Sequence, residues 1–165
     1  MHDTIARQLD VPKDSIKYDL EPGTGRYRVA VITFAPKKGQ SVDLQKIHES
    51  LKGTRLGKGT RSAVNFFEIT AEGDVTVADK DTRLQVSGTG QQFILVDDPK
   101  AQPKEGKKTP YQRLKEALAQ GEKIANVTGR VQGWNGTWPT VLKALSADAK
   151  KPTVLVVTDF LTVQK

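Results

Sequence analysis

Residues 26–51 constrain the fold more than any other stretch, because they carry the pattern of a strand, a turn and an amphipathic helix in succession. Residues 26–34 form a β-branched run that is too apolar for an edge strand. A turn at 36–39 ends that run, and Ser41 is expected to cap the helix that follows. Apolar residues then recur at helical spacing, namely Leu44, Ile47 and Leu51. The chain is therefore expected to be a mixed α+β protein.

Composition sets further limits on the chain of 165 residues, of which 36% are hydrophobic. That share is enough for a folded core, and no apolar run has the length of a membrane span. There is no cysteine, which excludes disulfides, thiolate metal sites and thiol catalysis. We expect a soluble chain, and the composition does not identify its compartment or oligomeric state.

The formal net charge of +7 permits an anionic partner, nucleic acid among them. Residues 1–80 carry 13 basic and 11 acidic side chains, and residues 81–165 carry 13 and 8. Because the excess is scattered along the chain, a solubilising surface is the favoured interpretation. The expected partners are thus a protein or an anionic ligand.

The order of predicted elements divides the chain near residues 75–80, into a first domain at 1–76 and a second at 77–165. The first domain is predicted to contain helices and strands in the order α-β-β-α-β, at 2–9, 15–20, 26–34, 42–52 and 65–70. The second is predicted to contain short strands and one helix that starts with a capping box at Thr109, Pro110 and Gln112. Its strands are expected at 75–78, 82–87, 91–96, 124–132 and 153–163.

The first domain resembles the heavy-metal-associated domain, a ferredoxin-like α/β sandwich found in copper chaperones. The segments that carry the resemblance are TIARQL, SIKYDL, YRVAVITF, VDLQKIHESL and NFFEIT. The family's Cys-x-x-Cys motif and first strand are missing, and Met1 falls in the register of the second cysteine. The resemblance therefore implies the fold without its metal site, and a segment such as 153–160 would have to take the missing strand's place beside 26–34.

The second domain resembles the oligonucleotide/oligosaccharide-binding (OB) fold, a small Greek-key barrel with one helix between its third and fourth strands. TRLQVSG, QQFILVDD, YQRLKEALAQG, ANVTGRVQGW and PTVLVVTDF carry this resemblance. A second ferredoxin-like unit is the alternative. An OB-like barrel implies a surface that binds nucleic acid or sugar.

Two groups of residues are candidate binding sites. The first is a set of cations in a glycine-bearing loop, where freed backbone amides would help to hold an anion: Lys52, Arg55, Lys58 and Arg61. The second is a set that would stack on bases or sugars from one face of the barrel: Arg83, Arg130, Trp134 and Trp138. A solvated loop is the favoured interpretation of the first group, and a sealed barrel end is the favoured interpretation of the two tryptophans. Phe66 and Phe67 point to opposite faces of their strand, so that one is expected to be exposed or packed against the other domain.

Catalytic and metal chemistry have little support. His2 and His48 are the only imidazoles, and Asp97 and Asp98 have no His, Ser or metal motif beside them. We expect no enzyme, no cofactor and no metal site. The leading hypothesis is a non-enzymatic binding or interaction protein that has lost a metal motif. The alternatives are a nucleic-acid-binding OB-like protein and a metal carrier whose cysteine motif lies upstream of Met1.

Overall fold

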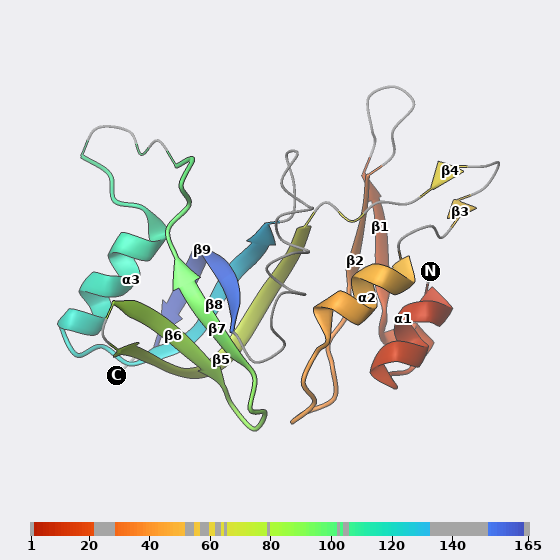
Figure 1. Cartoon of the computed structure of the whole chain (residues 1–165), viewed down its shortest axis with the longest axis horizontal. Coiled ribbons are helices and arrows are strands. Elements are labelled where there is room, and N and C mark those ends of the chain that lie inside the picture. The colour runs from red at the N-terminus through yellow and green to blue at the C-terminus, as the bar shows by residue number, and fades with distance from the viewer. Residues whose placement is uncertain are drawn as a thin grey trace. The chain divides into compact units, whose positions relative to one another are not determined.

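The computed structural model of the chain describes residues 2–21, 29–51, 55–56, 60–61, 64, 66–78, 80–101, 103, 106–132 and 152–163. It confirms a mixed α+β protein, with three α-helices among these residues, and the chain divides into two compact units, Met1–Ala63 and Val64–Lys165 (Figure 1). None of the helices in these residues combines the length and the apolar composition that crossing a membrane requires.

The described residues of the first unit form two short helices, a β-hairpin and a short two-stranded ladder. The elements are α1 (His2–Leu9), a 3-10 turn (Lys13–Ser15), β1 (Lys17–Glu21), β2 (Val29–Thr33), α2 (Leu44–Leu51), β3 (Arg55–Leu56) and β4 (Thr60–Arg61). β1 and β2, which lie within two of the predicted strand regions or next to them, pair antiparallel. Among the described side chains of the unit, the buried apolar ones come from both helices and from the segments beside them: Ile5, Val11, Ile16, Leu44, Ile47 and Leu51.

The cap of α2 differs from the expectation. The Lys46 backbone N–H donates to the Asp43 carboxylate at 2.9 Å, so Asp43 rather than Ser41 satisfies a free amide of the first turn. Both residue types favour this position, and the helix begins two residues later than the sequence pattern indicates.

A ferredoxin-like arrangement is not confirmed for the first unit. Among the described residues, β2 pairs with β1 alone, and a two-residue ladder joins β3 (Arg55–Leu56) to β4 (Thr60–Arg61). The strand expected at 65–70 and the C-terminal strand both pair inside the second unit. No described strand fills the place beside β2 that a ferredoxin-like sheet requires.

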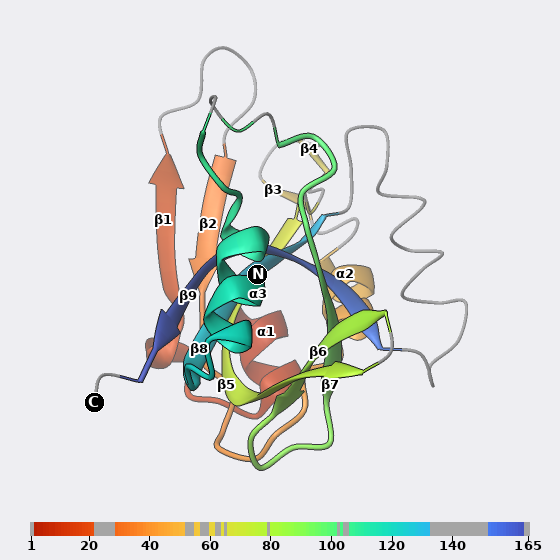
Figure 2. The same ribbon diagram turned by 90° about the vertical axis from the view of Figure 1, so that its left-hand side faces the viewer.

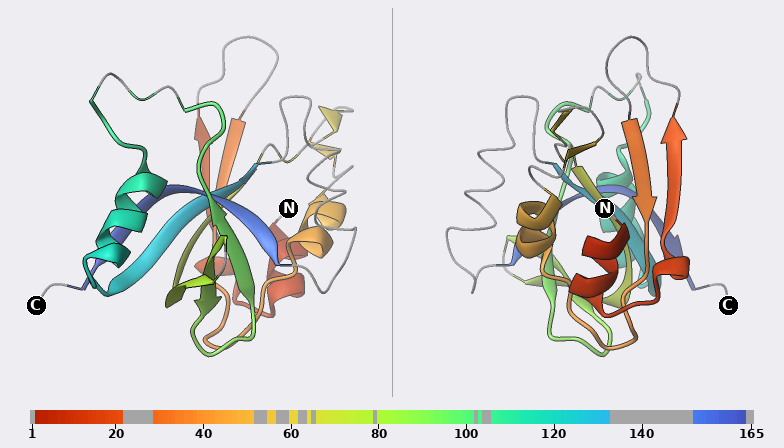
Figure 3. Two further views of the ribbon diagram at one scale, coloured as in Figure 1. Left: turned by 60° about the vertical axis from the view of Figure 1, so that its left-hand side comes forward. Right: turned by 90° about the vertical axis from the view of Figure 1, so that its right-hand side faces the viewer.

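The second unit is a closed five-stranded barrel. Its strands are β5 (Phe66–Ala78), β6 (Asp81–Val86), β7 (Gln92–Val96), β8 (Ile124–Gln132) and β9 (Thr153–Thr162). They close in the order β5-β6-β7-β9-β8, and all pairs are antiparallel except β7 with β9. One helix, α3 (Pro110–Ala119), connects the third and fourth strands and lies across one end of the barrel (Figures 2 and 3).

The division of the chain falls at residue 63, not near 76, because β5 is a single strand of 13 residues. Its first half pairs with β8 and its second half, from Gly73 onward, pairs with β6. Glu72-Gly73-Asp74 has the composition of a turn, which is why two strands were expected there. In the structure Gly73 marks a close approach of two backbones inside one long strand.

The interior of the barrel is filled by side chains. Its fully or nearly fully buried apolar residues include Leu84, Phe93, Leu95, Val127, Val131, Leu155 and Val157. Leu114 of α3 is also fully buried, and the Tyr111 hydroxyl lies 3.1 Å from the hydroxyl of buried Thr82. α3 therefore closes one end of the barrel with both apolar and polar contacts.

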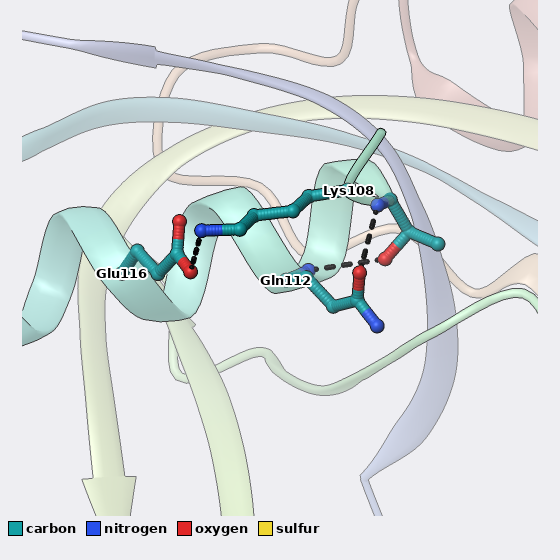
Figure 4. A network of polar contacts seen from close by, with 4 residues as sticks. Lys108, Gln112 and Glu116 are labelled. Atoms are coloured by element: carbon teal, nitrogen blue, oxygen red, sulfur yellow. Dashed lines mark hydrogen bonds and ion pairs between the residues drawn. The ribbon is translucent and has the colours of Figure 1, made fainter. Parts of the chain in front are cut away.

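The start of α3 confirms the predicted capping box. The Thr109 hydroxyl accepts a hydrogen bond from the Gln112 backbone N–H at 3.2 Å, and the Thr109 backbone N–H donates to the Gln112 side chain at 3.0 Å (Figure 4). The same figure shows the ion pair between Lys108 and Glu116 along the helix. The Thr109 hydroxyl also donates to Asp97 at 2.9 Å, which gives this half-buried carboxylate a structural role at the end of β7.

Candidate binding surface on the barrel

Four aliphatic side chains meet on the outer surface of β7 and β9. Along β7, Phe93 and Leu95 are buried, and the residues that alternate with them face outward. The parallel pairing of β7 with β9 then places Ile94 beside Val154 and Val96 beside Val156. We call these four residues, Ile94, Val96, Val154 and Val156, the outer patch.

The outer patch is partly open to solvent. Val154 is 42% exposed, Ile94 and Val96 are half-buried, and Val156 is 7% exposed. Val156 pairs with Arg130 of β8, and the aliphatic stem of an arginine commonly covers an apolar neighbour in this way. A contiguous apolar group on the outer face of a barrel is more informative than a single exposed valine.

Arg130 is held in place from two sides. Its Nε–H donates to the Glu68 carboxylate of β5 at 2.7 Å, and its guanidinium carbon lies 4.5 Å from the centre of the Phe66 ring. The Glu68 and Arg130 side chains are 46% and 43% exposed, and Phe66 is 44% exposed. The cluster of Phe66, Glu68 and Arg130, which we call the arginine cluster, adjoins the outer patch at Val156.

The two arginines of the second predicted site do not lie together. Arg83 pairs with Thr76 of β5, whereas Arg130 pairs with Glu68, eight residues earlier on the same strand, a separation of about 26 Å along a strand. Arg83 instead adjoins Ile94 and forms an ion pair of 3.2 Å with Asp81. Trp134 and Trp138 lie outside the described residues, so their place relative to either arginine remains a prediction.

The first predicted site is described only in part. Arg55 and Arg61 occupy paired positions of the β3–β4 ladder, which brings their backbones together as an anion site would need. Lys52 and Lys58 lie outside the described residues. The anion-binding role of this loop therefore stays a prediction.

No family model, curated protein or solved structure matches the chain. The function has to be inferred from the chemistry of the surface itself. Of that surface, the sequence indicated Arg130 and an outward phenylalanine, but not Glu68 or the four aliphatic residues. The four aliphatic residues come together only through the pairing of β7 with β9. The sequence signal for them is that QFILV and TVLVV are too apolar for strands that expose one face to solvent.

Counted by structural unit, the larger basic excess lies in the first unit, whereas the count by sequence halves placed it in the second half. Residues 1–63 carry 12 basic and 7 acidic side chains, whereas residues 64–165 carry 14 and 12. The five barrel strands hold five carboxylates and two arginines: Glu68, Glu72, Asp74, Asp81 and Asp159 against Arg83 and Arg130. The strands therefore lack the basic excess that is typical of a nucleic-acid-binding surface.

Two other features of the structure offer fewer groups for binding or catalysis than the barrel surface does. A hollow of about 440 Å³ lies between the bend of β5 and the end of α3, with Asp74, Glu122 and Lys123 at its edge. His48 is 2% exposed and packs within the first unit rather than at its surface. Among the described residues, no three histidine, aspartate or glutamate side chains group together in a way that would hold a metal ion.

Proposed function

We propose that the chain is a non-enzymatic binding protein whose OB-like barrel binds an extended segment of another protein on the outer patch. The strand order β5-β6-β7-β9-β8, the parallel pair β7–β9 and the helix between the third and fourth strands support the OB-like assignment. In that fold, ligands bind on the face of the second and third strands, here β6 and β7.

The filled interior supports binding at the surface. Leu84, Leu155 and Val127 are fully buried inside the barrel, and Leu114 of α3 closes one end. Small barrels of this kind have no room for an internal ligand once side chains fill them. A ligand would therefore meet outward-facing residues.

The observation that carries the proposal is the aliphatic character of the outer patch. The outward residues of β6 and β7 are polar or aliphatic, and none of those that the structure describes is aromatic: Asp81, Arg83, Gln85, Gln92, Ile94 and Val96. Nucleobases bind single-strand readers largely by stacking on aromatic rings. Aliphatic side chains instead suit the apolar side chains of a peptide in extended conformation.

Selection of peptides from a displayed random library on the whole protein tests the proposal. We expect the selected peptides to bind wild type and to bind Val154→Glu at least about tenfold more weakly, because a carboxylate in the patch must be desolvated by an apolar ligand. Val77→Glu is the matched control, since Val77 is a 57% exposed valine of the same barrel outside the patch. Equal affinity of the two variants would contradict the proposal.

Binding of single-stranded nucleic acid is the second candidate function. The stacking of Arg130 over exposed Phe66 favours it, as does the place of Trp134 and Trp138 in the connection from β8 to β9. Under this candidate, a labelled oligothymidylate shows micromolar binding that weakens steeply between about 50 and 200 mM salt. Phe66→Leu should then weaken binding, and no salt-sensitive binding would remove the candidate.

A further inference from the structure

We propose that Arg130 is an oxyanion site that takes a carboxylate of the bound protein segment, with Phe66 and Glu68 holding the guanidinium in the receiving orientation. This inference rests on the proposed function and adds the chemistry of the ligand to it. A segment that fits would carry an apolar side chain for the outer patch and an acidic side chain for Arg130.

Within the part of the chain that the structure describes, no group is seen at the receiving edge of the Arg130 guanidinium. The ion pair with Glu68 uses Nε, and the guanidinium carbon lies over the Phe66 ring. Among the described residues, Nε is the one guanidinium nitrogen of Arg130 for which a hydrogen bond is seen. The two terminal amino groups form a fork that can donate two parallel hydrogen bonds to the oxygens of a carboxylate.

The contacts of Arg130 with Phe66 and Glu68 also reduce the side-chain conformational entropy that Arg130 would lose when a ligand binds. An exposed arginine side chain has several rotatable bonds, and ordering it opposes association. Arg130 is already restrained by an aromatic face and a carboxylate, although its side chain is still 43% exposed. It is therefore preorganised and accessible at the same time.

Arg83 provides the contrast within the same barrel. Its side chain is 44% exposed and is also paired with a carboxylate, but the pair uses the terminal nitrogen Nη2, at 3.2 Å from Asp81. Part of its fork is thus already occupied, and no stacking ring is seen for it among the described residues. Arg83 matches Arg130 in charge and exposure and differs in preorganisation.

The position of the cluster sets the spacing of the ligand's groups. Arg130 and Val156 are paired across neighbouring strands, which lie about 4.8 Å apart. In an extended peptide, side chains at positions i and i+2 point to the same side and are about 6.6 Å apart. An acidic residue two positions from the apolar anchor therefore reaches the arginine cluster.

Glu68 has two opposing effects on such a ligand. It orients the guanidinium, and its negative charge also repels an incoming carboxylate. Glu68→Gln retains an oxygen that can accept from Nε and removes the repulsion, so it is expected to strengthen binding. Glu72→Gln is the matched control, because Glu72 is an exposed carboxylate of the same strand that pairs with Asn126 instead.

The test uses a fluorescent heptapeptide in which isoleucine and glutamate alternate at every second position, with threonine between them. We expect Glu68→Gln to tighten binding roughly threefold to tenfold and Glu72→Gln to change it less than about twofold. Arg130→Lys should weaken binding by at least about fivefold, since lysine keeps the charge and loses the fork. Arg113→Lys is the control, because Arg113 is an exposed arginine of α3 outside the outer patch and the arginine cluster, and it should change binding less than about twofold. A peptide with glutamine in place of glutamate should show none of these differences.

Several outcomes would overturn the inference. These are equal effects of the two glutamine variants, equal affinity for the glutamine peptide, or no binding of the heptapeptide to either wild type or Glu68→Gln. If Glu68→Gln bound oligothymidylate more tightly than wild type does and showed no gain in affinity for the heptapeptide, the site would be assigned to phosphate. The proposal that the ligand group is a carboxylate would then be rejected. Loss of selected-peptide binding in Val154→Glu without any effect of Glu68→Gln would leave the proposed function standing and reject this inference alone.

Discussion

Replacing Gly73 with alanine is expected to destabilise the barrel by about 3 kcal/mol, at the upper end of overpacking effects. A Cβ at this position would lie 2.0 Å from the carbonyl oxygen of Gln85 and 2.8 Å from its carbonyl carbon. Both atoms belong to the backbone of β6, so no side-chain rotation can relieve the clash. The two strands would have to separate where β5 passes from β8 to β6.

Gly90→Ala is the control for this prediction. A Cβ at Gly90 would meet no atom within 4 Å, and its φ does not lie in the left-handed region. We expect its free energy of unfolding to stay within about 0.5 kcal/mol of wild type. Urea denaturation followed by far-UV circular dichroism and by amide signals of β5 measures both variants. A Gly73→Ala protein as stable as Gly90→Ala would show that β5 and β6 are not so close.

Leu114→Ala is expected to cost about 2–5 kcal/mol of stability. Leu114 is fully buried, and it is the side chain with which α3 closes the barrel end. Shortening it removes apolar contacts and leaves a cavity that a rigid barrel refills poorly. The same denaturation experiment on signals of α3 and β9 measures the effect.

Leu161→Ala is the matched control for Leu114→Ala. Leu161 is 58% exposed on β9, so its truncation should change stability by less than about 0.5 kcal/mol. Similar losses for the two leucines would contradict the view that α3 seals a filled interior. That outcome would also reopen the barrel end as a place for a ligand.

Local signals predicted those parts of the fold that depend on local chemistry. The capping box at Thr109 confirms this, since both of its hydrogen bonds join residues three apart. The strand at 124–132 was predicted with the bounds that the structure shows. The prediction failed to place the boundary of the units because a glycine between two acidic residues marks a turn in most contexts. Only the approach of β6 shows why Gly73 belongs within a strand.

The binding surface was harder to predict from the sequence, because it too depends on contacts between strands that are distant in sequence. Arg130 was singled out by its residue type, but its partner Glu68 lies 62 residues earlier and is brought to it by the register of β5 and β8. The outer patch depends on a parallel pairing between β7 and β9. Strand register over such separations is set by the whole barrel and not by any short pattern.

The place of β9 between β7 and β8 has a consequence for synthesis on the ribosome. β9 is the last strand of the barrel in sequence, so β5 to β8 emerge and pair before the strand that joins their two open edges exists. Those edges would be free to pair with another nascent chain during that interval. Closure must also await contacts between distant residues, which is typical of slow folding. Chaperones would therefore be expected to bind the barrel in the interval between the synthesis of β8 and that of β9.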